Sequence, residues 1–120
     1  MERVLGIGGL FLRSEDPEAL AHWYRTHLGL DADAHGLWHP EAAGPTVFAT
    51  FPADTDHFGS RTQQAMLNFR VRDLDAMLAQ LRAAGAAVDD EVQEMDGVGR
   101  FGWVTDPGGH RVELWEVTSG

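Results

Sequence analysis

The 120-residue chain has no cysteine, no long apolar run and few basic residues. Without cysteine it can form no disulfide, no thiolate metal site and no thiol nucleophile, which suits a reducing cytoplasm. No stretch approaches the roughly 18 apolar residues of a membrane span, so we expect no membrane insertion. Nine Lys and Arg against 19 Asp and Glu give a net charge of −10, which argues against nucleic acid as a partner and slightly favours cationic ligands.

The length fits one domain, residues 1–120, with a modest core. The opening stretch MERVLGIGGLF is short and is followed at once by Arg13, Ser14, Glu15 and Asp16. We interpret it as a first strand and not as a signal peptide.

The chain also carries an internal repeat. GGLFLRSEDPEALAHWY, starting at Gly8, aligns without gaps with AMLNFRVRDLDAMLAQL, starting at Ala65. An apolar strand, an aspartate and an amphipathic helix recur in the same register. The repeat therefore predicts two similar modules.

Each half predicts one short helix. Asp16 fits an N-cap with Pro17 at the first helical position, and Gly29 can close that helix in a left-handed conformation. In the second half Asp73 is the N-cap and Gly85 ends the helix. The apolar stripes at helical spacing are Leu20, Trp23, Tyr24 and Leu28, then Leu74, Met77, Leu78 and Leu81.

Three strands are predicted after each helix, at about 30–34, 36–39 and 46–51, then at 87–94, 100–105 and 111–117. The result is an α+β fold of two βαβββ modules, about 3–60 and about 61–118. A duplicated βαβ ferredoxin-like domain is the alternative, but it would have fewer strands after each helix.

Two such modules that close on TDPGGHRVELWE resemble the vicinal oxygen chelate superfamily of glyoxalase I, bleomycin-resistance proteins, fosfomycin-resistance enzymes and extradiol dioxygenases. The resemblance covers nearly the whole chain, with SEDPEALAHWYRTHLGL (14–30) and NFRVRDLDAMLAQLRAAGA (68–86) as its other specific parts. It implies a single glyoxalase-like domain with an open, curled mixed sheet around a ligand cleft, helices on the outside and a homodimer.

The resemblance also implies metal ligands on the first and last strand of each module. The two first-strand positions are Gly9 and Met66, which offer no suitable donor, and the strand at 46–52 has no His, Asp or Glu. Only Glu113 remains, and one carboxylate does not hold a divalent ion. We therefore predict no cofactor; the alternative is Zn, Ni, Mn or Fe with Glu113 as the sole retained ligand.

Strand alternation predicts which side chains face the cleft. The ligand-binding set is Phe11, Phe48, Met66, Asn68, Arg70 and Trp115, together with Glu113. A buried carboxylate needs a partner, and we expect Arg70, or else Arg13 or Arg100, to pair with Glu113. His39 and His57 can reach the cleft mouth, and the segment at 51–59 either overhangs the cleft or is an ordinary connector.

Three functions fit this reading. The first is a metal-free, bleomycin-resistance-like protein that binds a small aromatic or cationic molecule. The second is a lyase or other enzyme that acts on a small carbonyl compound or epoxide, with Glu113 as catalytic base or metal ligand. The third is a dimeric interaction module with a vestigial cleft.

Overall fold

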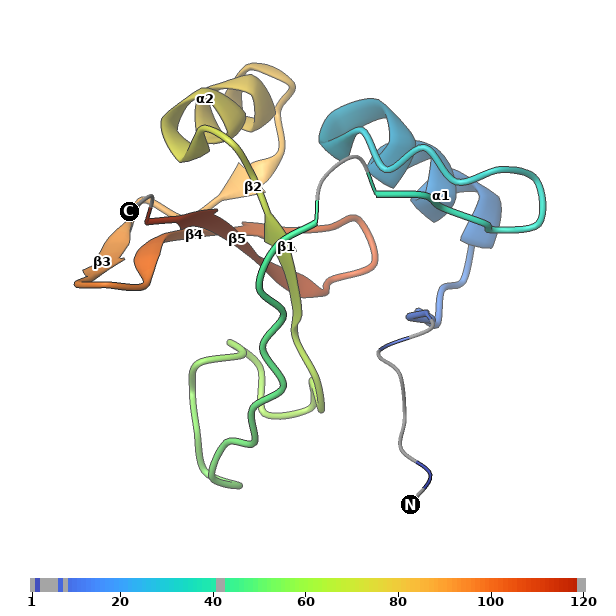
Figure 1. Cartoon of the computed structure of the whole chain (residues 1–120). Helices are drawn as coiled ribbons and strands as arrows, with labels where there is room; N and C mark the ends of the chain where they lie inside the picture. The colour runs from blue at the N-terminus through green and yellow to red at the C-terminus, as the bar shows by residue number, and fades with distance from the viewer. Residues whose placement is uncertain (1, 3–6, 8, 41–42, 119–120) are drawn as a thin grey trace.

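The computed structural model describes residues 2, 7, 9–40 and 43–118. Along the chain the elements are α1 (Pro17–Leu28), β1 (Leu67–Arg70), α2 (Leu74–Ala83), β2 (Ala87–Val88), β3 (Gln93–Met95), β4 (Gly99–Thr105) and β5 (Arg111–Val117) (Figure 1). Within the described residues they form a small α+β fold with an open, mixed sheet of five strands and two helices. The α+β class and the open, mixed sheet are as the sequence predicts, whereas the number of strands is smaller.

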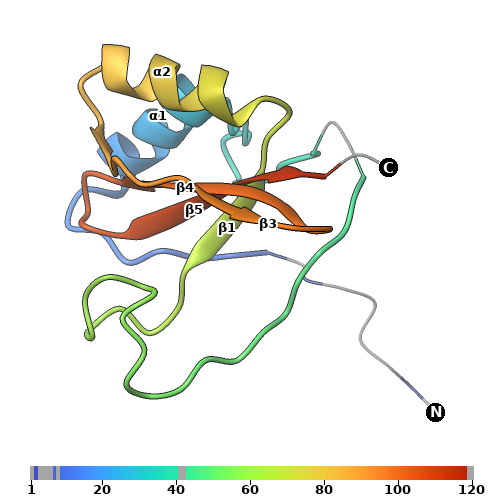
Figure 2. The same cartoon turned by 90° about the vertical axis from the view of Figure 1, so that its left-hand side faces the viewer.

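The sheet has the order β1-β5-β4-β2, and β3 also pairs with β4. β1 runs parallel to β5, whereas the other pairs are antiparallel. Both helices lie on one side of the sheet, and the connecting segment 43–66 lies on the other (Figure 2). The two faces of the sheet therefore have different surroundings.

Both helices begin as predicted. The Asp16 carboxylate accepts a hydrogen bond from the Ala19 amide at 3.1 Å, and Asp73 accepts one from Ala76 at 3.0 Å. Gly29 closes α1 at φ 67°, a left-handed conformation that glycine adopts without steric cost. These caps satisfy amide groups that would otherwise lack partners at the helix ends.

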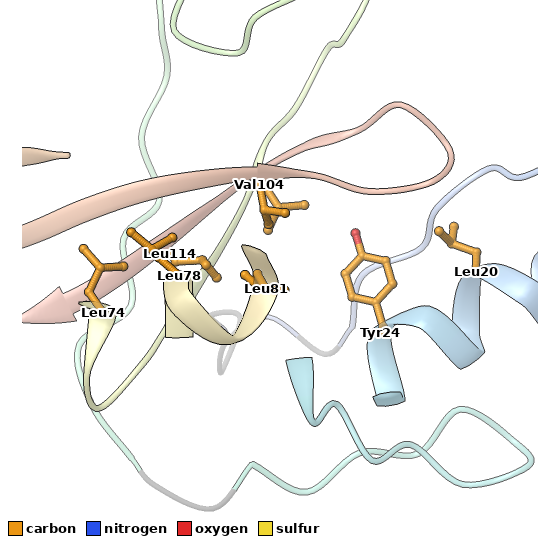
Figure 3. Close-up of a cluster of buried hydrophobic side chains, with 8 residues drawn as sticks. Leu20, Tyr24, Leu74, Leu78, Leu81, Val104 and Leu114 are labelled. Atoms are coloured by element: carbon orange, nitrogen blue, oxygen red, sulfur yellow. The ribbon is translucent and has the colours of Figure 1, made fainter. Parts of the chain in front are cut away.

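The core lies between the helices and the sheet (Figure 3). α2 places three fully buried leucines against β4 and β5, and α1 adds two more buried side chains. Burying each large apolar side chain contributes about 1.5–3 kcal/mol. The buried cluster consists of Leu20, Tyr24, Leu74, Leu78, Leu81, Val104, Val112 and Leu114.

The second module has its predicted strands, with one change. The single strand expected at 87–94 is divided into β2 and β3. Asp89 lies between them, where its amide still bonds the Trp103 carbonyl and its carboxylate accepts from Arg111 at 2.5 Å. The irregular stretch is thus held by a side-chain ion pair in place of a strand ladder.

In the first module only the helix forms as expected. Among the described residues no strand is assigned before Leu67, so the strands predicted at 30–34, 36–39 and 46–51 are wrong for this chain on its own. Part of the predicted first strand lies outside the described residues, and 9–13 has no strand assignment. An extended segment becomes a strand only beside a partner ladder, and apolar alternation alone supplies none.

In the part of the chain that is described, no helix has both the length and the apolar character needed to cross a membrane.

Candidate ligand cavity

A cavity of about 720 Å³ lies on the sheet face that the helices leave open. Two strands, β1 and β5, form its floor, and residues from the segments 7–10, 45–53 and 55–66 contribute its other walls. The parallel register of β1 and β5 places Asn68 beside Glu113 and Arg70 beside Trp115. Leu67, one residue before Asn68, packs against the core and also contributes to the cavity lining.

Glu113 is the buried polar centre of the cavity, with 8% of its surface exposed. Its Oε1 accepts a hydrogen bond from Asn68 Nδ2 at 2.7 Å, and its Oε2 accepts from Trp103 Nε1 at 3.0 Å. His57 Nε2 lies 3.0 Å from the same Oε2. Both carboxylate oxygens therefore have N–H partners, which compensates for burial of the charge.

His57 reaches this site from the connecting segment, as the sequence allowed. Its ring stacks on Phe51 with centroids 5.2 Å apart and planes 6° apart. It meets the Trp103 ring edge-on, at 5.9 Å and 90°. Neither His57 nor His39 is among the residues that line the cavity, and His39 lies exposed to solvent.

The expected pairing of Arg70 with Glu113 is wrong. Arg70 lines the cavity, but its Nη1 donates to the Pro45 carbonyl at 2.6 Å. The alternatives also fail, because Arg100 pairs with Asp75 and Glu94 and Arg13 is exposed. Neutral donors and an imidazole therefore satisfy Glu113 where we expected a guanidinium.

The structure brings most of the predicted ligand-binding residues together. Phe48, Met66, Asn68, Arg70 and Trp115 all line the cavity with Glu113. Phe11 does not line it, and its side chain is 97% exposed. Trp115 is buried, stacks on Phe101 and donates its Nε1 hydrogen to the Val98 carbonyl, so it forms a fixed wall.

Residues 9–115 match the model of the glyoxalase-like domain, which covers most of the chain. The chain belongs to this family. Among proteins with curated functions, none matches this glyoxalase-like domain significantly.

Solved structures share the fold of this glyoxalase-like domain. TnmS3, described as an antibiotic-binding protein from Streptomyces sp. CB03234, has a TM-score of 0.63 and 23% identity over 98% of this chain and 100% of its own. A glyoxylase/bleomycin resistance protein/dioxygenase domain from Frankia sp. EAN1pec has a TM-score of 0.64 and 18% identity, with 97% and 100% covered. A glyoxalase/bleomycin resistance protein from Streptomyces sp. CB03234 is 25% identical, with a TM-score of 0.56 and 88% and 95% covered.

In this glyoxalase-like domain the positions expected to carry metal ligands meet at one cavity. Gly9, Met66 and Glu113 all line it, and so do Phe48 and Thr50 from the segment at 46–52. Across the described residues, no three His, Asp or Glu side chains converge as a metal site would require. Because N–H donors occupy both oxygens of Glu113, the donor set does not fit a divalent ion. Metal-free binding stays a prediction.

Gln63 holds the connecting segment of the glyoxalase-like domain to β5, a contact that the sequence pattern does not predict. Gln63 Oε1 accepts from the Arg111 amide at 2.8 Å, while Gln63 Nε2 donates to the Arg111 carbonyl at 2.9 Å. Arg111 Nε in turn donates to the His57 carbonyl at 3.1 Å. Of the two readings for the segment at 51–59, the overhanging one fits, because its Phe51, Pro52 and Thr55 line the cavity. A sequence spacing of 48 residues gave no signal for the Gln63 contact.

Proposed function

We propose that this domain binds a small, mostly aromatic molecule in the cavity, without a metal. The cavity itself is the observation that carries this proposal. Its volume of about 720 Å³ lies within the range of about 300–1,000 Å³ that is usual for small-molecule sites. Phe48, Phe51, Phe58 and Trp115 supply aromatic surface in its lining.

Local charge favours a neutral or anionic aromatic ligand over a cation. The lining includes Arg61 and Arg70, against one carboxylate, Glu113, whose oxygens already accept hydrogen bonds. The net charge of −10 belongs to the whole chain, and salt screens exposed charges beyond about 8–10 Å. The groups at the cavity therefore weigh more than the distant acidic surface.

The antibiotic-binding description of TnmS3 is consistent with a binding role. At 23% identity it supports the fold, and the ligand of this chain has to be argued from its own cavity.

Fluorescence titration tests the proposal with three aromatic probes: neutral 2-naphthol, anionic anilinonaphthalene sulfonate and cationic proflavine. We expect the neutral and anionic probes to bind, and Phe48→Ser to weaken both at least fivefold. Met95→Ser is the matched control, since Met95 is an exposed apolar side chain outside the cavity lining. If no probe binds, or if Phe48→Ser matches the control, the proposed function fails.

Elemental analysis of protein purified without chelators tests the metal-free part separately. We expect Zn, Ni, Mn and Fe all well below one equivalent per chain. One equivalent of any of them, lost in Glu113→Gln, would overturn this part of the proposal while leaving the binding role intact.

In the alternative function, a lyase or another enzyme that acts on a carbonyl compound or epoxide, Glu113 would be the catalytic base. A base needs a free lone pair toward its substrate, whereas Asn68, Trp103 and His57 surround this carboxylate. This arrangement favours binding over proton abstraction by Glu113.

We also propose a homodimer, because one copy leaves large apolar side chains uncovered. Phe11 is 97% exposed, Phe48 86% and Val47 65%, all in segments that lack strand partners within the described chain. Covering them with a second copy would stabilise the dimer by about 25 cal/mol for each Å² of apolar surface buried. Light scattering after size exclusion should give a dimer mass that Phe11→Ser lowers and Met95→Ser does not; a monomeric wild-type protein would refute the proposal.

A further inference from the structure

We propose that Asn68 selects among ligands, because the oxygen of its side-chain carboxamide, Oδ1, accepts a hydrogen bond from a hydroxyl or N–H group. This inference rests on the proposed binding function and narrows the ligand to an aromatic molecule that carries a hydrogen-bond donor. It follows from the place of Asn68 in the cavity, from the bond that orients its carboxamide and from the charge beside it.

Asn68 lies in the floor of the cavity, on strand β1. Its neighbour Phe69 packs against the core and does not line the cavity, whereas Asn68 and Arg70 both line it. The Asn68 side chain is exposed, and pairing with β5 holds its backbone in register with Glu113. A group on a paired strand is held more precisely than one on a loop. The sheet therefore fixes the position of this carboxamide at the ligand site.

The hydrogen bond to Glu113 fixes which end of the carboxamide is which. Asn68 Nδ2 lies 2.7 Å from Glu113 Oε1, and the reversed orientation would set two oxygens against each other. Glu113 is itself held, because it is buried and its Oε2 accepts from Trp103 Nε1. With Nδ2 turned to Glu113, Oδ1 is the polar atom left for a ligand, and it accepts no hydrogen bond from the described residues. A carboxamide does not titrate, so this acceptor does not depend on pH.

The charge of Glu113 favours a ligand donor over a ligand acceptor at this place. A carboxamide that donates to a carboxylate is polarised, which makes its oxygen a stronger acceptor and its remaining N–H a weaker donor. Gln63, another carboxamide in the lining, is already bonded at both ends to the Arg111 backbone. Asn68 Oδ1 is thus both unoccupied and strengthened by its neighbour.

These facts separate two groups of ligands. A phenol, alcohol or amide N–H can donate to Oδ1, whereas an ether or ketone of the same shape cannot. Loss of one such hydrogen bond should lower the affinity about fivefold, which corresponds to about 1 kcal/mol.

The test compares 2-naphthol with 2-methoxynaphthalene, which share the ring system and differ in the donor. The wild-type protein should bind 2-naphthol about fivefold more tightly. Asn68→Leu keeps a side chain of similar size but removes the carboxamide, so the preference should vanish while both probes still bind. Gln93→Leu, which removes an exposed carboxamide outside the cavity, should keep the preference.

Equal binding of the two probes by wild-type protein would overturn the inference and leave the proposed function standing. If neither probe binds, the proposed function fails and the inference fails with it. A preference that survives in Asn68→Leu would also overturn the inference, because another group would then be the acceptor.

Carbon-13 NMR tests the same bond in the wild-type protein, and it decides alone if Asn68→Leu does not fold. Asn68 is the only asparagine of the chain, so asparagine labelled at its side-chain carbonyl gives one signal. At saturation, 2-naphthol should move this signal to higher frequency, because the carbonyl gains a hydrogen bond, and 2-methoxynaphthalene should move it much less. Equal shifts with both probes would overturn the inference.

Discussion

The only tyrosine of the chain, Tyr24, joins helix α1 to the turn between β4 and β5. Its hydroxyl donates to Asp106 Oδ2 at 2.6 Å, and both residues are buried, with 6% and 4% of their surface exposed. Asp106 also accepts from the Gly108 and His110 amides and lies 2.8 Å from His110 Nδ1. The contact spans 82 residues of sequence and connects the two modules.

Tyr24→Phe removes this hydroxyl and little else. A hydrogen bond to a charged acceptor contributes about 1.5–3 kcal/mol, so we expect the free energy of unfolding to fall by about 2 kcal/mol. For a domain of this size the melting temperature should drop by roughly 6–10 °C. Urea unfolding provides the measurement. Thr26→Val, which removes an exposed hydroxyl from the same helix, should change the free energy by less than about 0.5 kcal/mol.

Alkaline pH gives a second, independent measurement. Burial first, and then the bond to Asp106 and its negative charge, raise the pKa of Tyr24 well above its ordinary value. The folded protein therefore keeps the phenol proton where the unfolded chain has lost it. This stability is fully present below about pH 10 and is lost as pH rises above it, by at most about 1.4 kcal/mol per pH unit.

The chain has neither cysteine nor lysine, and arginine stays protonated, so Tyr24 is the only side chain that titrates near pH 10. Tyrosinate absorbance should appear together with unfolding in the wild type, and Tyr24→Phe should lack the alkaline loss of stability. A tyrosinate signal at about pH 10 in protein that is still folded would refute this reasoning, as would an unchanged free energy of unfolding in Tyr24→Phe.

Three further predictions concern the cavity and the sheet. Glu113→Gln leaves at least one of three N–H donors without an acceptor, so urea unfolding should show that the free energy of unfolding falls by about 2 kcal/mol. The exposed Glu94→Gln is the control, and an equal or smaller loss in Glu113→Gln would contradict the hydrogen bonds assigned to Glu113. Gln63→Ala should speed hydrogen exchange at the Arg111 amide with little change in global stability, and slow exchange there would show that the Gln63 bond does not protect it. Gly99→Ala should lower the free energy of unfolding by more than about 3 kcal/mol, because a Cβ would lie 2.1 Å from the Glu116 carbonyl oxygen. Gly97→Ala, also at positive φ but in open space, should lower it by about 1 kcal/mol. Equal losses in the two variants would refute the clash.

Local chemistry in the sequence was enough to place the helices. Asp16 with Pro17, and Asp73, begin α1 and α2 at the predicted residues, because a cap depends on neighbours three positions away. Alternation along β1 and β5 likewise predicted that Asn68 and Glu113 face one cavity. Such local rules also gave the family resemblance that the match over 9–115 confirms.

Contacts between distant residues were beyond the same reasoning. Charge alone suggested Arg70 for Glu113, but the partner His57 comes from a segment 56 residues away, and no spacing rule predicts it. The predicted strands of the first module were wrong for a related reason. Alternation indicates that a segment can pair in a sheet, but whether a partner strand lies beside it depends on residues elsewhere in the sequence. Phe11, predicted for the cavity wall, belongs to one of these segments and is exposed.

The central place of β5 in the sheet has a consequence for synthesis on the ribosome. Asn68 on β1 is in register with Glu113 on β5, which is translated 45 residues later. At a translation rate of about 5–20 residues per second, β5 is synthesised roughly 2–9 s after β1. During that interval the nascent chain exposes an unpaired strand edge, so we expect ribosome-associated chaperones to bind stalled chains from which β5 has not emerged more strongly than released full-length chains.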